Sequence, residues 1–196
     1  MKRFLITVLL LSVAGSAFAE WTLDNDDSRL NFISIKAGNI AELHQFRSFS
    51  GSVDAKGNLL VVVDLTSVDT SIEVRDGRMR EFLFETDTYP SAQLTAAIDM
   101  EAIEDIDEGD SGVMTVDANL AIHGASLPLS IEVLVSRLDD DELVVSSFKP
   151  LVVNAADVDL AAGVEKLREL AGLPSISLAV PVTFNLIFDS NIQYIL

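Results

Sequence analysis

Apolar and polar residues alternate with a period of two over most of this chain from Arg29 onward, and this alternation constrains the fold more than any other feature. A period of two places successive side chains on opposite faces of a β-strand, whereas a helix needs a period of 3.6. The residues expected to share one strand face in each run are Leu30, Phe32 and, less clearly, Ser34; Phe49, Gly51 and Val53; Val61, Val63 and Leu65; Met114, Val116, Ala118, Leu120 and Ile122; Leu129, Ile131, Val133 and Val135; and Ile176, Leu178, Val180, Val182, Phe184, Leu186 and Phe188.

Turn-forming stretches separate the runs, and few segments between them are long enough to be crossover helices. These turns are expected at Ala55–Asn58, Glu108–Gly112, His123–Gly124 and Asp139–Asp141. Short strands at near-regular spacing are typical of antiparallel sheets, so the sequence predicts an all-β sandwich or barrel.

Two segments have helical rather than strand periodicity. Ser71–Thr86 predicts a first helix, with Thr70 or Ser71 as its N-cap. A second helix is predicted at about 158–171, because Gly172 suits its C-cap and Pro174 its end. Asp157 or Asp159 is its expected N-cap, and its apolar stripe consists of Leu160, Val164, Leu167 and Leu170.

Residues 1–19 have the three zones of a secretory signal peptide. Lys2 and Arg3 form the charged start, Phe4–Val13 the apolar stretch, and Ala17–Ala19 an A-x-A cleavage site. The sequence therefore predicts cleavage before Glu20, export to the periplasm and one domain over residues 20–196. No later segment is apolar enough to span a membrane, and the absence of cysteine excludes disulfides.

The chain is strongly acidic but also rich in apolar residues. Its formal net charge is −18 and its mean hydropathy is +0.36. Such a charge repels nucleic acids, so nucleic-acid binding is not expected. The high hydropathy indicates more buried apolar surface than a minimal core requires.

Several short motifs resemble the YceI family in order and spacing. They are Trp21–Asp24 with Ser28, Leu30 and Phe32; FRSFSGSV over Phe46–Val53; Ser67–Thr70 with Arg75-Asp76; Tyr89-Pro90; and Leu120–Gly124 with Pro128-Leu129. The resemblance implies a lipocalin-like antiparallel β-barrel of about eight strands with one or two short helices. It also implies that the barrel interior holds an isoprenoid-type lipid, polyprenyl or quinone-like. The segment Asn154–Ser177 departs from the common family pattern and indicates an added helix.

The alternation itself does not distinguish a barrel with a ligand cavity from one filled by side chains. The alternative function is therefore a non-catalytic stress-response or respiratory-chain interaction module with a filled core. If there is a cavity, Phe32, Phe49 and Phe82 are the aromatic candidates for ligand contact. The expected partners are an isoprenoid lipid and, as one option for assembly, a second copy of the chain.

Positive charge is concentrated in the segment VRDGRMR, Val74–Arg80. We expect Arg75 and Arg78 to face the polar end of a ligand, because a guanidinium donates paired hydrogen bonds to anionic oxygens. The alternative is a solvated helix face on which neighbouring carboxylates neutralise the arginines. Those carboxylates are Glu73, Asp76 and Glu81. Asp76 is expected to pair with Arg75 or to form a turn.

The two histidines indicate neither catalysis nor metal binding. His123 is expected to be structural, with contact to a ligand head group as the alternative, and His44 to be a surface residue. Two histidines without cysteine do not make a usual transition-metal site, and Asp105–Asp110 fails the calcium-loop pattern. No nucleophile elbow or nucleotide-binding motif is present. We therefore expect a protein that is not an enzyme and has no cofactor other than a bound lipid; a hydrolase with an unrecognised site is the remaining rival.

Overall fold

The computed structural model describes residues 21–139 and 141–190, so the expected signal peptide lies outside the described residues. The strands are β1 (Trp21–Lys36), β2 (Ile40–Phe46), β3 (Phe49–Val53), β4 (Asn58–Asp64), β5 (Val68–Asp69), β6 (Ser91–Ala97), β7 (Ser111–Ile122), β8 (Ala125–Arg137), β9 (Glu142–Ser147), β10 (Leu151–Asn154) and β11 (Ala179–Ser190). The helical segments are η1 (Leu65–Ser67), α1 (Glu73–Arg78), η2 (Met79–Leu83), α2 (Met100–Glu104), η3 (Ala155–Val158) and α3 (Ala161–Ala171).

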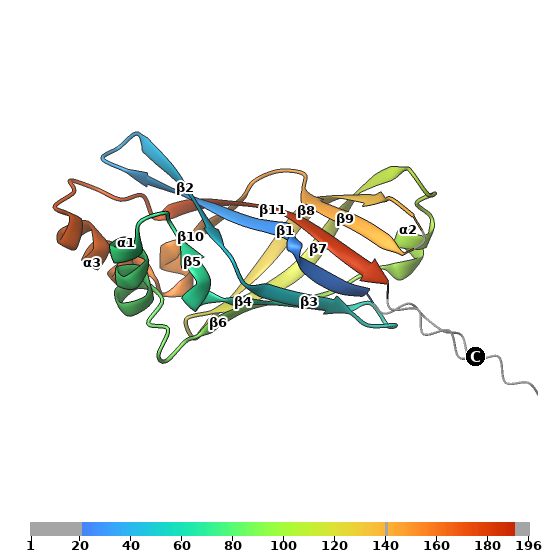
Figure 1. Cartoon of the computed structure of the whole chain (residues 1–196), viewed down its shortest axis with the longest axis horizontal. Helices are drawn as coiled ribbons and strands as arrows, with labels where there is room; N and C mark the ends of the chain where they lie inside the picture. The colour runs from blue at the N-terminus through green and yellow to red at the C-terminus, as the bar shows by residue number, and fades with distance from the viewer. Residues whose placement is uncertain (1–20, 140, 191–196) are drawn as a thin grey trace, which may run out of the picture.

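Eight of the described strands close into an antiparallel barrel, which confirms the predicted fold class (Figure 1). Around the ring the order is β1, β3, β4, β6, β7, β8, β9 and β11. The barrel closes where β11 pairs with β1, from Trp21↔Ser190 to Phe32↔Val182. The pairing shifts register once, between Asp24 and Arg29, and closure otherwise leaves no free edge along this seam.

The long strand β1 pairs with two different strands along the same edge. Its first residues, Trp21 and Thr22, pair with β3, whereas residues 30–36 pair with β2. The hairpin of β1 and β2 therefore extends the barrel wall beyond β3. Strand β5 pairs in turn with β2. This extension places β2 side chains at one end of the barrel.

The predicted alternation is confirmed inside the barrel. On β7, the inward residues Met114, Val116 and Leu120 are less exposed than the outward residues between Ser111 and Asp117. Leu178 is the exception among the predicted inward residues, since it is 37% exposed. Strand β11 begins only at Ala179, so residues before it do not follow the strand period.

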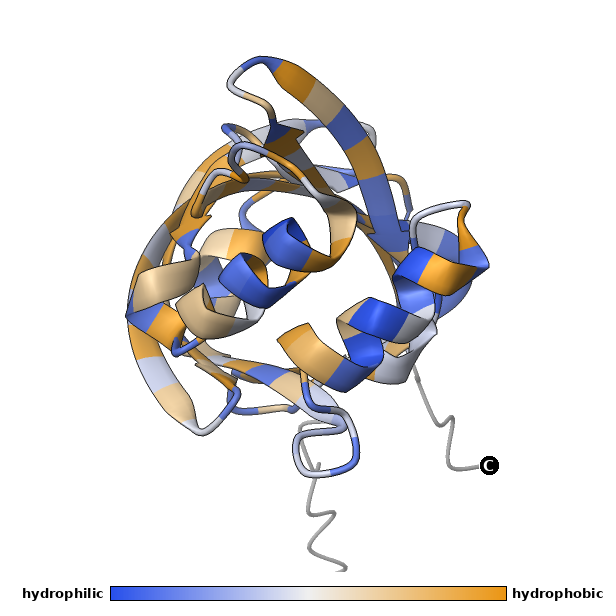
Figure 2. Cartoon of the chain, turned by 90° about the vertical axis from the view of Figure 1, so that its left-hand side faces the viewer, coloured by the Kyte–Doolittle hydropathy of each residue, from blue (hydrophilic) through white to orange (hydrophobic). Residues whose placement is uncertain are grey.

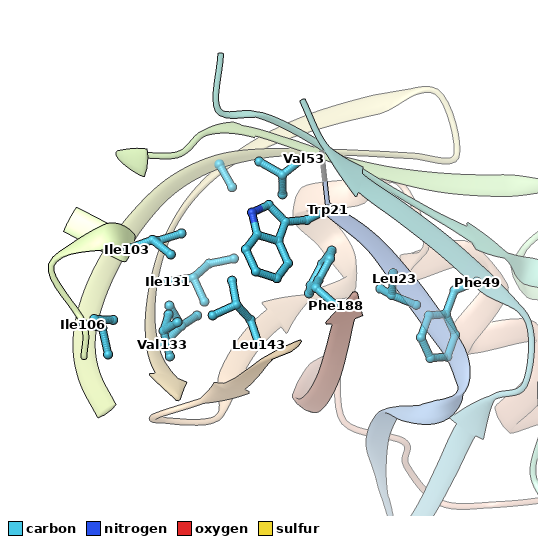
Figure 3. Packing of buried hydrophobic residues seen from close by; sticks show 12 residues of the cluster. Trp21, Leu23, Phe49, Val53, Ile103, Ile106, Ile131, Val133, Leu143 and Phe188 are labelled. Carbon is cyan, nitrogen blue, oxygen red and sulfur yellow. The ribbon is translucent and has the colours of Figure 1, made fainter. Parts of the chain in front are cut away.

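One end of the barrel is closed by apolar packing against α2. Figure 3 shows the indole of Trp21 among Val53, Ile131 and Phe188, close to Ile103. Each of these side chains is less than a tenth exposed. Their burial fixes this end of the barrel through the hydrophobic effect.

The opposite end carries α1, η2 and α3 (Figure 1), which lie across the ring of strands when seen from that end (Figure 2). Helix α3 packs directly on the backbone of η2. A Cβ atom on Gly163 would lie 2.6 Å from the carbonyl oxygen of Phe82 and 2.7 Å from Cα of Leu83. Only glycine permits this close approach of two helical segments.

The first predicted helix is present, but its predicted N-cap is wrong. It runs as α1 and then as the π-helical turn η2, and its N-cap is Ile72 without a side-chain hydrogen bond. Thr70 does not cap the helix because its hydroxyl bonds to the side chains of Arg75 and Asp76.

The second predicted helix begins three residues later than predicted. Residues 155–158 form the 3₁₀ turn η3, whose N-cap is Asn154. Asp159 has a left-handed backbone, and the N-cap of α3 is Leu160, so neither predicted aspartate caps the helix. Gly172 adopts the left-handed C-cap conformation with φ of 63°, as predicted.

Candidate functional site

The barrel encloses a cavity of about 450 Å³ between the side chains of the described residues. Apolar side chains from all eight barrel strands form its wall. One example from each strand, in ring order from β1, is Leu30, Phe49, Val61, Leu94, Val116, Leu129, Val145 and Phe184. The volume lies within the range of small-molecule binding pockets.

Many inward side chains along the middle of the barrel are only partly buried, although they point away from bulk solvent. Leu94, Val116 and Phe184 are examples, and all three border the cavity. In a filled barrel these positions would be buried against one another. The interior of this barrel is therefore a cavity rather than a close-packed core.

The polar lining of the cavity is confined to the end that carries α1 and α3. The polar and charged residues along the wall are Asn31, Ser34, Lys36, Glu42, His44, Arg75, Arg78 and Ser177. They come from β1, β2, α1 and the segment before β11. The cavity thus has an apolar body and one polar end, which suits an amphipathic ligand.

Arg75 lies at this polar end, and its guanidinium is held by protein groups. Nη1 donates to Oε2 of Glu42 at 2.8 Å, while Nε and Nη2 donate to Oγ1 and the carbonyl oxygen of Thr70 at 2.8 and 2.6 Å. Glu42 also accepts from Nζ of Lys36 at 2.8 Å. The hydrogen bond from Lys36 and the charge of Arg75 lower the pKa of the Glu42 carboxyl.

The ion pair expected between Arg75 and Asp76 is not formed. The Asp76 carboxylate instead accepts hydrogen bonds from the backbone N–H and the hydroxyl of Thr70. Asp76 is buried, with 9% exposure. Asp76 therefore fixes the turn before α1, which is the turn-forming role expected as the alternative. The carboxylate that pairs with Arg75 is that of Glu42, 33 positions away in sequence.

Arg78, the last residue of α1, also borders the cavity, and its side chain reaches toward α3. Its Nη1 is 3.4 Å from the carbonyl oxygen of Leu170 near the end of α3. Arg80 does not border the cavity, and its Nη1 is 3.4 Å from the carbonyl oxygen of Thr66. The three arginines therefore do not form a single cationic group.

His44 is not a surface residue, so its predicted place is wrong. Its side chain borders the cavity and is 4% exposed. Nε2 lies 2.8 Å from Oγ of Ser34, and the ring lies 5.1 Å from that of Phe32. Burial, with a smaller effect from the charge of Arg75, lowers the pKa of the imidazole.

On β2 two polar side chains face the cavity and an apolar one faces outward, the reverse of the usual pattern. For this reason the sequence did not identify His44 and Glu42 as cavity residues. Leu43, the apolar residue between them, points outward and is 67% exposed. The spacing of Glu42, His44 and Phe46 at every second residue was the available signal for a shared inward face.

Phe32 and Phe49 border the cavity, but His123 and Phe82 do not. His123 lies in the turn between β7 and β8, where Nε2 is 3.1 Å from the Glu85 carboxylate and the ring is 4.5 Å from that of Tyr89. The aromatic side chain at the cavity in this region is that of Phe84, the C-cap of η2. The structure thus brings together Phe32, Phe49, Arg75 and Arg78 among the predicted site residues.

Among the described residues, no group of three or more His, Asp or Glu side chains is arranged to hold a metal ion. None of the helices in the described part of the chain is long and apolar enough to cross a membrane.

Comparisons with known proteins agree with this architecture. The YceI-like domain family matches residues 21–188. A solved polyisoprenoid binding domain from Saccharophagus degradans, implicated in plant cell wall breakdown, has 40% sequence identity and a TM-score of 0.85; the match covers 87% of this chain and 98% of that domain.

Two more distant structures share the fold alone. BcnA from Burkholderia cenocepacia has 20% identity and a TM-score of 0.66, and the match covers 84% of this chain and 98% of that one. The YCEI protein of Campylobacter jejuni has 14% identity and a TM-score of 0.54, with 76% and 85% of the two chains covered. A comparison with curated proteins gave no match.

Proposed function

The chain belongs to the YceI-like domain family, and on this premise we propose that it binds an isoprenoid-type lipid non-covalently and shelters the apolar tail inside its barrel. The observation that carries this proposal is the cavity with an apolar wall and a single polar end. The 40%-identical domain from Saccharophagus degradans is itself described as polyisoprenoid binding.

Burial of the tail supplies most of the binding free energy in this proposal. Each methylene group transferred from water contributes about 0.8 kcal/mol. The apolar wall extends from Met100 and Ile103 at the α2 end to Leu83 and Val164 at the other. A tail that follows this length removes far more apolar surface from water than the head group does, so the head group mainly orients the ligand.

Action in the periplasm is part of the proposal, and it rests on the signal-like residues 1–19. We propose a carrier or reservoir rather than an enzyme, because the cavity wall is almost wholly apolar and its carboxylate, Glu42, is held between Lys36 and Arg75. Assembly as a homodimer stays a prediction.

The direct test is native mass spectrometry of the protein recovered from the periplasm of its own cells, followed by identification of any bound lipid. We expect a mass above that of the polypeptide and release of an isoprenoid on denaturation. Recovery without lipid, together with failure to take up an added prenyl lipid, would contradict the proposal.

A matched pair of variants on β7 distinguishes cavity binding from surface adsorption. Val116→Trp places a large ring inside the cavity, whereas Thr115→Trp places it on the outward face of the same strand. We expect Val116→Trp to lose prenyl-lipid uptake and Thr115→Trp to keep it. Thermal unfolding of both lipid-free variants shows whether any loss reflects folding. Equal uptake by two folded variants would place the lipid outside the barrel.

A further inference from the structure

The polar end of the cavity contains a hydroxyl and an imidazole that make no hydrogen bond to the network of Arg75, Glu42 and Lys36. Ser34 on β1 and His44 on β2 both border the cavity, and Oγ of Ser34 lies 2.8 Å from Nε2 of His44. His44 is 4% exposed, so its ring is held in place by its surroundings. The pair is therefore a fixed polar feature at the polar end of the cavity.

The surroundings of the ring select one tautomer. Within the described residues, Nδ1 of His44 is buried and has no hydrogen-bond partner. A neutral imidazole carries one N–H group, and burial keeps this ring neutral by lowering its pKa. A buried N–H without an acceptor is rarer than a buried acceptor without a donor. The proton therefore resides on Nε2, where it is donated to Ser34.

This tautomer leaves the Ser34 hydroxyl as a donor. Its oxygen accepts from His44, so its own O–H is not used in that bond. The described residues give it no other hydrogen-bonded acceptor. A ligand in the cavity that carries an acceptor oxygen beside Ser34 would complete the pair, whereas a purely apolar ligand would leave the hydroxyl unsatisfied at a cost.

The four charged side chains that act most strongly on the imidazole are Arg75, Glu42, Asp76 and Lys36, two cations and two anions. Glu42 binds both Lys36 and Arg75 at 2.8 Å, so these cations are already held by a protein carboxylate. Ser34 therefore offers a ligand an uncharged hydrogen-bond donor that is separate from the ion pairs of this end.

We propose that the Ser34 hydroxyl, positioned by His44, donates a hydrogen bond to an uncharged carbonyl oxygen in the head group of the bound lipid. The inference rests on the proposed function. Ser34 is the ligand-contacting residue, His44 is a positioning residue, and Arg75 supports the wall rather than receiving an anion.

The test compares two probes of equal prenyl length: a prenylated benzoquinone and a prenyl hydrocarbon without a head group. Each displaces a fluorescent apolar dye from the lipid-free full chain at neutral pH. We expect the quinone to bind about three- to tenfold more tightly than the hydrocarbon, the effect of one net hydrogen bond.

Variants test whether Ser34 and His44 cause the preference for the quinone over the hydrocarbon. Ser34→Ala and His44→Phe should abolish the quinone-to-hydrocarbon ratio while leaving hydrocarbon binding in place, and Ser34→Thr should restore the ratio because it keeps the hydroxyl. Ser130→Ala on the outward face of β8 is the control and should change nothing. Because the readout is a ratio between two probes, a general loss of stability does not imitate the effect.

The outcomes separate this inference from the proposed function. If neither probe binds the parent protein, the proposed function fails, and this inference fails with it. If the parent protein binds the hydrocarbon as tightly as the quinone, or if Ser34→Ala keeps the parent ratio, the cavity binds lipids without the Ser34 hydrogen bond and this inference alone is overturned.

Discussion

Replacing Gly163 by alanine should loosen the helical end of the barrel. The new Cβ would lie 2.6 Å from the carbonyl oxygen of Phe82 and 2.7 Å from Cα of Leu83, both backbone atoms that cannot rotate away. Overpacking of this kind costs about 1–3 kcal/mol. Alanine also gains about 1 kcal/mol over glycine within a helix. The net change in the free energy of unfolding is thus a loss of up to about 2 kcal/mol.

The chain offers a matched control in Gly77→Ala on α1. A Cβ there meets only Nη2 of Arg80, at 4.0 Å, so the helical gain is not offset by a clash. We expect Gly77→Ala to raise the free energy of unfolding by about 0.5–1 kcal/mol.

Urea titration and thermal unfolding of the lipid-free proteins measure the difference between the two variants. A chain of this size loses roughly 2–4 °C of Tm for each kcal/mol, so Gly163→Ala should unfold several degrees below the parent and Gly77→Ala slightly above it. Because α3 covers the polar end of the cavity, Gly163→Ala should also release a bound prenyl lipid faster. If Gly163→Ala stabilises the protein as much as Gly77→Ala does, α3 does not lie against the η2 backbone and the reasoning is refuted.

Three further outcomes are expected. Leu160→Ala should cost about 2–5 kcal/mol because Leu160 is buried, and partly exposed Leu167 should cost less when truncated; equal losses in urea titration would contradict this packing. Arg75→Ala should cost about 1.5–3 kcal/mol, since Glu42 and Thr70 lose charge-assisted hydrogen bonds, and an unchanged Tm would mean that this network is not formed. Because the pKa of His44 is lowered in the folded protein, His44 takes up a proton in the unfolded chain before it does in the folded one as the pH falls below 6.5. Stability should therefore decline from there through the lower folded pKa, and His44→Gln should reduce this decline, as urea titrations across the range would show.

Much of the barrel follows from the sequence because side-chain direction in a strand depends only on local backbone geometry. The inward positions of β7 and β8 match the predicted Met114–Ile122 and Leu129–Val135 runs. Gly172 also ends α3 as predicted, since a left-handed C-cap is a local requirement. Local rules were less reliable at helix starts, where Thr70 bonds within the Arg75 and Asp76 network instead of capping α1.

The site depended on contacts that local rules do not describe. Glu42 meets Arg75 because β2 extends past β3 along β1, an arrangement set by strand pairing and not by the residues of either segment alone. The same pairing turns His44 inward and Leu43 outward, against their polarity. Phe84 rather than Phe82 reaches the cavity because η2 is a π-helical turn, which shifts the faces expected of an α-helix.

The sequence by itself therefore determined the strands β1, β3, β4, β7, β8 and β11, the side of the sheet on which most of their side chains lie and the approximate position of the added helix. Only the tertiary structure decided that the interior is a cavity and that its polar groups meet at one end. The physical reason is that alternation specifies the direction of each side chain, whereas the enclosed volume depends on how eight strands close around it, which involves pairings between residues far apart in sequence.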